Sequence, residues 1–208
     1  MNSRLSADVI TQQFIRERLE PFWTRTISSP FELEGRKAAV LIPFFKRDGQ
    51  WHIIYTRRSE TVNDHKGQVS FPGGAVEVGD DSFTATALRE AYEEIGLEPA
   101  AVEILGAMGK FQSVSRFTIQ PIVAYIQEPQ TYTLSADEVA RVFSIPLSWL
   151  SDPTNFYIQE WQTPAGQLRP VFFFNDYDGE KLWGISAIIT IQLLNILGLL
   201  DQPIPDYL

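Results

Sequence analysis

Residues 67–97 read GQVSFPGGAVEVGDDSFTATALREAYEEIGL, and this stretch predicts a strand, a glycine-rich loop and a helix in succession. Residues 68–71 alternate polar and apolar side chains, which favours a short strand, and the Pro-Gly-Gly that follows ends it. Three residues that can cap a helix precede its first apolar residue, Phe83. They are Asp80, Asp81 and Ser82. The helix is expected to end at Ile95, because Gly96 suits the left-handed residue that commonly follows a helix.

Three glutamates are spaced so that they meet on one side of this helix. Glu90, Glu93 and Glu94 fall within an arc of ~100°, whereas the apolar residues fall on another side and can pack inward. Their mutual repulsion costs a few tenths of a kcal/mol per pair, about what such like-charged pairs cost in helices. A hard divalent cation, which prefers carboxylate and carbonyl oxygens, would offset that repulsion. Periodicity alone leaves two interpretations open, an ordinary solvated acidic face and a cation site.

The run REAYEEIGL at 89–97 resembles the second half of the Nudix box, G-x5-E-x7-R-E-U-x-E-E-x-G-U, in which U is apolar. The first half differs, because the loop is one residue longer and Asp replaces Glu. Counting back from Arg89 places Asp81 at the acidic position, and counting forward from Gly74 places Asp80 there. The resemblance implies a Nudix hydrolase with an α/β (α+β) fold, an α/β/α sandwich built on a mixed β-sheet.

A second motif lies immediately upstream. Residues 65–74, HKGQVSFPGG, are similar to the motif of the coenzyme A pyrophosphatase branch of Nudix enzymes, roughly LLTxRSxxLxxHxGQVxFPGG, whose front half falls on residues 54–62. Residues 115–123 and 182–187 are similar to two further fragments of that branch, SGFxVTPVV and WGLTA. This resemblance implies hydrolysis of coenzyme A (CoA) or its derivatives to 3′,5′-ADP and 4′-(acyl)phosphopantetheine.

Two alternatives stay open beside that function. The differences from the branch motifs at Tyr55, Arg116 and Gln120 leave room for another nucleoside diphosphate derivative. ADP-ribose, dinucleoside polyphosphates and nucleoside triphosphates belong to this class. A Nudix module that binds a nucleotide without cleaving it is disfavoured, because a sensor has no need of the complete set of three glutamates.

The Nudix resemblance also implies a site for Mg²⁺ or Mn²⁺. Glu90 and Glu94 are expected to bind the metal directly, and Glu93 to bind a second ion or orient water. A carbonyl of Gly73 or Gly74 would complete the site. Arg89 is expected to pair with Asp80 or Asp81 and so hold the loop against the helix. The expected catalytic residues are Glu93, Glu94, Glu138 and Arg89, although Glu138 also fits a helix-capping role after Ser135.

Five residues upstream are expected to bind the substrate: Arg57, Arg58, His65, Lys66 and Gln68. The three basic side chains among them could meet phosphates, but each also suits a solvated surface position. His65 suits either a phosphate contact or a structural role in its loop. Trp183 is expected in the core rather than as a platform for a base.

The whole chain has 208 residues, of which 44% are hydrophobic and 21% charged, with a formal net charge of −9 and no cysteine. These values predict a single domain over 1–208, with a core at about 37–200 and an N-terminal helix at 6–22. The negative charge argues against nucleic-acid binding. The sequence shows neither a signal peptide nor a membrane-spanning run, so a cytoplasmic protein with a small-molecule substrate is expected. The oligomeric state stays open, a homodimer included.

The remaining elements follow from local patterns. Pro21 and Pro30 are expected to bracket a loop, and the pair Ser135 and Glu138 predicts a helix start at 135–143. Pro121 is expected at a sheet edge, a bulge or a strand start. A closing helix is predicted at 186–197. Strands are predicted at 37–45, 51–56, 102–108, 117–126, 142–147, 156–161 and 171–174.

Overall fold

The computed structural model describes residues 5–28, 36–61, 65–113, 117–127, 131–162, 166 and 168–200. Pro30 of the predicted loop and Arg116 of the third motif lie outside these residues. No helix in the part of the chain so described is both long and apolar enough to cross a bilayer.

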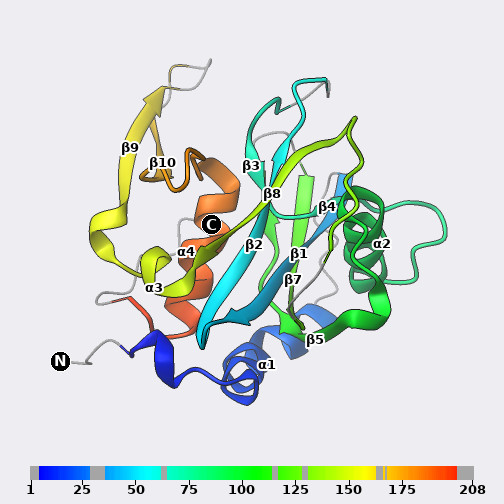
Figure 1. Ribbon diagram of the computed structural model, residues 1–208, viewed down its shortest axis with the longest axis horizontal. Helices are drawn as coiled ribbons and strands as arrows, with labels where there is room; N and C mark the ends of the chain where they lie inside the picture. Colours follow the sequence, from blue (N-terminus) through cyan, green and yellow to red (C-terminus); the bar gives the residue numbers. More distant parts are fainter. Residues whose placement is uncertain are drawn as a thin grey trace.

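A mixed sheet forms the centre of the molecule, as the sequence predicts (Figure 1). Its main path runs β3-β2-β1-β7-β5, in which β1 and β7 are parallel and the other neighbours antiparallel. Three more strands join it, β4 on β1, β6 on β7 and β8 on β2. The bounds are β1 Arg36–Arg47, β2 Gln50–Arg58, β3 Val69–Ser70, β4 Gly73–Ala75, β5 Val102–Ala107, β6 Phe111–Gln112, β7 Phe117–Ile126 and β8 Val139–Pro146.

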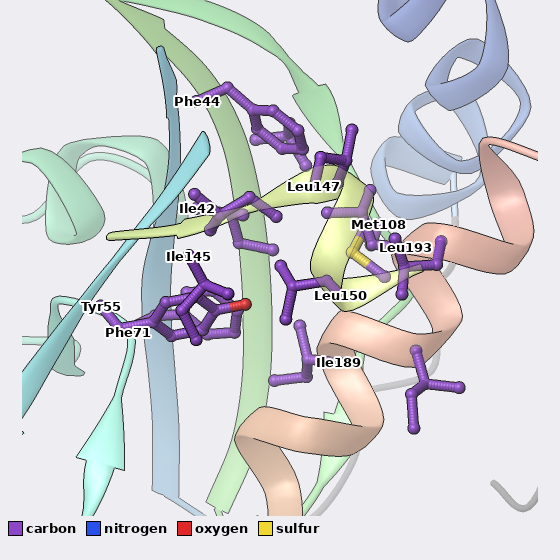
Figure 2. Packing of buried hydrophobic residues seen from close by; sticks show 14 of the residues in the cluster. Ile42, Phe44, Tyr55, Phe71, Met108, Ile145, Leu147, Leu150, Ile189 and Leu193 are labelled. Carbon is purple, nitrogen blue, oxygen red and sulfur yellow. The ribbon is translucent and has the colours of Figure 1, made fainter. Parts of the chain in front are cut away.

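Helices cover both faces of the sheet, so the predicted α/β/α sandwich is confirmed (Figure 1). The helix α2 (Phe83–Ile95) packs through Ala87 and Ala91 on one face. On the other face α4 (Gly184–Ile196) packs through Ile189 and Leu193 against a larger core that includes Tyr55 (Figure 2). The remaining helices are α1 (Gln12–Ser28) and α3 (Leu147–Leu150), with short 3₁₀ turns at Ala7–Val9, Pro99–Ala101 and Pro153–Asn155.

The N-terminal helix differs from its prediction at both ends. The hydroxyl of Ser6 accepts the N–H of Asp8 and closes a separate 3₁₀ turn, so α1 begins later, where the hydroxyl of Thr11 accepts the N–H of Phe14. Pro21 lies inside α1 rather than in a loop. Proline removes one helical hydrogen bond, a loss that tertiary packing of the helix can offset.

Residues 135–143 do not form the predicted helix. A turn at 136–138 leads directly into β8, which pairs with β2 in the register Ile53↔Ile145. Phe143 and Ile145 alternate into the core on one face of the sheet, and Val139, beyond a register shift opposite Arg57 and Arg58, is buried on the other face. Long-range pairing therefore overrides the local capping pattern.

Pro121 lies in the middle of β7, which has neighbours on both sides and keeps an unbroken register with β1 there, so the prediction of a sheet edge, a bulge or a strand start is wrong. The N–H of Met108 donates to the carbonyl of Pro121 at 3.1 Å, but proline has no N–H to donate in return. The side-chain Nε2 of Gln120 donates to the carbonyl of Met108 instead, at 2.7 Å. A neighbouring amide thus replaces the missing backbone donor.

A separate hairpin lies beside the N-terminal end of α4 (Figure 1). Its strands are β9 (Phe156–Gln162) and β10 (Leu168–Phe174), which pair antiparallel and confirm the two strands predicted there. Phe173 forms a β-bridge with Trp183, and the N–H of Phe174 donates to the carbonyl of Leu182. These contacts tie the hairpin to the segment that enters α4.

Candidate active site

The helix α2 begins and ends as its sequence predicts. The hydroxyl of Ser82 accepts the N–H of Ala85, and Gly96 adopts the left-handed conformation at the other end, with φ of 69°. Ala87, Ala91 and Ile95 are fully buried against the sheet. This packing places the acidic side of the helix beside β4 and the loop that follows it.

Glu94 is a buried carboxylate, with 3% of its side chain exposed. Its Oε2 accepts the backbone N–H of Gly73 at 3.2 Å, and its Oε1 lies 3.9 Å from Nη1 of Arg58. The pKa of Glu94 is raised to about 8, mainly by burial and in part by repulsion from Glu90 and Glu138, against the opposing effects of the Gly73 N–H and of Arg58. The carboxylate therefore lies where a cation would be favourable.

Glu90 lies against the backbone of the glycine-rich loop. A Cβ atom added at Gly74 would stand 2.4 Å from its Oε1, so only glycine leaves room for this carboxylate. Burial raises the pKa of Glu90, although Nη1 of Arg89 donates to it at 3.0 Å. The burial of Glu94 and the partial burial of Glu90 contradict the interpretation of an ordinary solvated acidic face.

Arg89 fastens the loop to the helix. Its Nε and Nη2 donate to both oxygens of Asp80, and Nη2 also donates to the carbonyl of Ala75. Nη1 donates to Glu93 at 2.9 Å. These bonds, with the N–H of Glu77, hold the pKa of Asp80 well below its usual range.

The contacts of Arg89 decide which aspartate, Asp80 or Asp81, takes the acidic position of the motif. Asp80 contacts Arg89, whereas Asp81 is exposed. Asp80 lies at the motif's spacing from Gly74, so the extra residue falls between Asp80 and Arg89, where Asp81 is exposed. The loop before Asp80 closes in a turn, in which the N–H of Asp80 donates to the carbonyl of Glu77. Val78 in that turn is fully exposed. The extra residue is therefore absorbed at the exposed entry to α2, next to the capping residue Ser82, and Arg89 still reaches Asp80.

Two further glutamates, Glu93 and Glu138, lie at the solvent-exposed edge of the acidic cluster. Glu93 is exposed over 53% of its side chain and is held by Arg89. Glu138 is exposed at the start of β8, and its charge raises the pKa of both Glu90 and Glu94. The structure therefore brings Glu138 near the buried pair, although its predicted helix is absent.

A cavity of ≈ 570 Å³ opens beside this acidic cluster. Arg58, His65 and Gln68 line it together with Gly73 and Gly74. His65 has a positive φ of 58°, and its Nδ1 lies 2.9 Å from Oε1 of Gln68. Three of the five expected substrate-binding residues are thus brought to one place.

The other two lie elsewhere. Nε of Arg57 lies 3.6 Å from Glu180, a buried acid that also accepts a bond from Arg141. Lys66 is exposed and does not line the cavity. Arg57 and Arg58 are neighbours on β2, and neighbouring strand residues point to opposite faces. The motif LLTxRS itself separates them, because its fixed arginine falls on Arg58 and its variable position on Arg57.

Sequence reasoning missed the wall of the cavity that comes from the C-terminal part of the chain. Val171 of β10 and Ile185 and Ile189 of α4 line it. Trp183 is half-buried and also lines it, rather than lying in the core as expected. The fragment at 182–187 was the signal for Trp183, whereas nothing in the local sequence marks Val171.

The donor set fits a hard cation. Glu90 and Glu94 offer carboxylate oxygens at a largely desolvated place, and burial is the main cause of the raised pKa of each. Among the residues described, no three acidic or histidine side chains converge into a preformed metal cage. An ion bound here would therefore take its remaining ligands from backbone oxygens and water, as Mg²⁺ commonly does.

Comparison with known proteins identifies the family. A model of the NUDIX domain matches residues 35–161. The chain belongs to the Nudix hydrolase family. It is 40% identical over 197 residues to a Cronobacter sakazakii protein described as uncharacterized Nudix hydrolase NudL, covering 95% of this chain and 97% of that one. A Citrobacter koseri protein of the same description is 46% identical over 166 residues, covering 80% and 85%.

Among solved structures, a MutT/nudix family protein from Enterococcus faecalis is similar with a TM-score of 0.49 and 15% identity, covering 90% of this chain and 78% of that one. As a Nudix hydrolase, the protein is an enzyme that hydrolyses phosphoric anhydride bonds. Nudix hydrolases act on small nucleotide derivatives and generally use divalent metals such as Mg²⁺ or Mn²⁺.

Replacing Gly74 by alanine is expected to reduce activity, whereas replacing Gly73 by alanine is expected to reduce stability. Gly74→Ala should lower kcat/KM by about a hundredfold, the scale of a small displacement at a catalytic site, because the new methyl group displaces the carboxylate of Glu90. Gly73→Ala should lower stability instead, because its Cβ would stand 2.4 Å from the carbonyl of Ala39 at a φ of 155°.

Steady-state kinetics and thermal unfolding of both variants check this prediction. Gly109→Ala is the matched control, because nothing lies within 4 Å of a Cβ added there. Full activity in Gly74→Ala would show that the position of the Glu90 carboxylate is unimportant.

Proposed function

We propose that the enzyme hydrolyses the pyrophosphate bond of CoA or a CoA derivative, giving 3′,5′-ADP and 4′-(acyl)phosphopantetheine. One observation supports this most directly. Arg58, His65 and Gln68 of the upstream motif line the same cavity as Gly73 and Gly74 of the Nudix loop. The residues that resemble the CoA branch therefore adjoin the residues that resemble the catalytic machinery.

In the proposed reaction, a water oxygen attacks one phosphorus and the bridging P–O bond breaks, so the second phosphate leaves with the bridging oxygen. A bound Mg²⁺ or Mn²⁺ would neutralise phosphate charge and acidify water. Glu90 and Glu94 would hold the metal with a carbonyl of Gly73 or Gly74, and Glu93 and Glu138 would orient water or accept its proton. Arg58 is placed to meet phosphate charge, since it lies at both the cavity and Glu94.

Arg89 has a positioning role in this proposal. Its contacts with Asp80, Ala75, Glu90 and Glu93 fix the loop and two of the acids relative to each other. It would thereby set the geometry of the metal ligands without touching the substrate.

We also propose that the chain forms a single domain. Phe172 and Phe174 of β10 and the buried face of α4 lie beyond the matched Nudix segment. They nevertheless share one hydrophobic core with Ile15 and Leu19 of α1. This shared core supports folding as one unit.

A substrate panel tests the assigned activity. CoA, ADP-ribose, diadenosine tetraphosphate and a deoxynucleoside triphosphate are each incubated with the enzyme and Mg²⁺ or Mn²⁺, and the products are identified by mass spectrometry. We expect CoA or an acyl-CoA to give the highest kcat/KM and to yield 3′,5′-ADP. If CoA compounds fall far behind the other substrates, the CoA assignment is wrong while the Nudix chemistry stands.

A further inference from the structure

The cavity beside the Nudix loop has walls of two kinds. Where it meets the loop it is polar, with Arg58, His65 and Gln68. The other residues that line it are mostly apolar and come from the sheet, β10 and α4. The apolar residues there are Ala38, Val40, Phe117, Ile119, Val171, Ile185 and Ile189. The hydroxyl side chains of Ser70, Ser113 and Ser186 line the same space.

An aromatic surface continues from this cavity onto the hairpin. The ring of Trp183 lies 5.7 Å from that of Phe173 at an interplanar angle of 4°, and 6.4 Å from that of Trp161 at 23°. Phe173 in turn stacks on Tyr157 at 5.5 Å and 12°. We refer to Tyr157, Trp161, Phe173 and Trp183 as the aromatic platform.

The platform is open to solvent at its outer end. Trp161 is 53% exposed and Tyr157 41% exposed, although both are large apolar side chains. Tyr157, Trp161, Val171 and Phe173 alternate along their strands on a single face of the hairpin. Because Val171 and Trp183 also line the cavity, the aromatic platform adjoins it, and the polar Gln159 lies on the same face of the hairpin, between Tyr157 and Trp161.

This shape favours a long ligand over a compact one. A compact nucleotide would fit within the cavity and would leave the exposed rings of the aromatic platform in contact with water. A flexible arm with a few amides suits a cavity whose apolar lining is interspersed with hydroxyls. A hydrocarbon chain beyond that arm would cover exposed aromatic rings that otherwise face water.

We propose that the aromatic platform binds the acyl chain of a CoA thioester, so that the enzyme prefers medium- or long-chain acyl-CoA to free CoA. This proposal rests on the proposed function. The phosphopantetheine arm separates the cleaved bond from the thioester, so the arm occupies the cavity while the chain lies along the platform. The acyl group is unchanged by the reaction and contributes binding alone.

The test compares kcat/KM for CoA, acetyl-CoA, octanoyl-CoA and palmitoyl-CoA, each below the concentration at which it forms micelles. The expected value for octanoyl-CoA exceeds that for acetyl-CoA by about tenfold, since part of the free energy of burying each methylene is gained. Trp161→Ala should remove most of this gain and leave free CoA and acetyl-CoA unaffected.

Ile158→Ala is the matched control. Ile158 is 47% exposed on the same strand, but it lies on the opposite face of the hairpin. The control should keep the full chain-length preference. Circular dichroism and thermal unfolding confirm that each variant is folded, and Tyr157→Ala provides a second platform variant.

A binding measurement separates this proposal from the assigned activity. A dansyl-labelled fatty acid, which carries no phosphate, is expected to bind the wild type and Ile158→Ala but not Trp161→Ala, and octanoyl-CoA should displace it. Equal kcat/KM for all chain lengths, or equal losses in Trp161→Ala and Ile158→Ala, overturns the platform while CoA hydrolysis stands. Platform-dependent probe binding without cleavage of any CoA compound overturns the activity and keeps the chain-binding surface. If neither probe binding nor cleavage of a CoA compound is observed, the chain-binding surface and the assigned activity are both wrong.

Discussion

Glu94→Gln is expected to abolish turnover while leaving the fold intact. Removing one charged metal ligand costs several kcal/mol of transition-state stabilisation, which lowers kcat by about a thousandfold or more. The fold should survive because glutamine has the same shape and its amide oxygen can accept the N–H of Gly73 in place of Oε2. Burial already disfavours the charged form of this carboxyl group, so a neutral amide is readily accommodated.

Two measurements check this expectation. Added Mg²⁺ or Mn²⁺ should raise the midpoint of thermal unfolding for the wild type, because a ligand that binds only the folded state stabilises it. The increase should be lost in Glu94→Gln and kept in Glu98→Gln, whose side chain is exposed just beyond the helix. Undiminished Mg²⁺- or Mn²⁺-dependent activity in Glu94→Gln would refute its assignment as a metal ligand.

Arg89→Met is expected to cause the largest loss of stability among single substitutions at the site. The change keeps the aliphatic stem but leaves Asp80, of which only 7% is exposed, and the carbonyl of Ala75 without their donor. Breaking such a partly buried network costs about 2–4 kcal/mol. The midpoint of thermal unfolding should fall by roughly 5–15 °C for a chain of this length.

Activity should fall with stability, because the loop that carries Gly73 and Gly74 loses its attachment to α2. Lys181→Met is the matched control, since Lys181 pairs with Asp176 at the surface at 3.5 Å, where ion pairs contribute little. A stability change in Arg89→Met no larger than in the control would contradict the clamp formed with Asp80.

The helix α2 shows how far the sequence alone could go. Ser82 and Gly96 are local signals, and a helix end depends mainly on residues within one turn of it. Both ends were therefore predicted correctly. Glu90 and Glu94 were identified in the same way, because their spacing along the helix is fixed by the backbone. Their unequal exposure compared with Glu93 was not predictable, since it depends on where β4 and the loop press against the helix.

Local patterns failed where distant segments compete for the same residues. The capping pattern at Ser135 and Glu138 predicts a helix, but pairing with β2 provides a complete ladder of hydrogen bonds and a buried face for Phe143 and Ile145. Pro121 is expected at a sheet edge, a bulge or a strand start, because no local signal reveals that Gln120 replaces its missing donor. Arg57 and Arg58 likewise differ only in the face of β2 on which each lies.

The sequence by itself determined the helix at 83–95, both of its ends and the family to which the stretch at 67–97 belongs, whereas Gly73–Ala75 of the predicted loop form the strand β4 on β1. These follow from spacing along the chain, which is a covalent property. Only the tertiary structure decided that Asp80 rather than Asp81 pairs with Arg89, which places the added residue between Asp80 and Arg89. It also decided that β10 and α4 complete the cavity. The physical reason is that burial and side-chain contacts across the sheet depend on which remote segments pack together, and local periodicity carries no record of them.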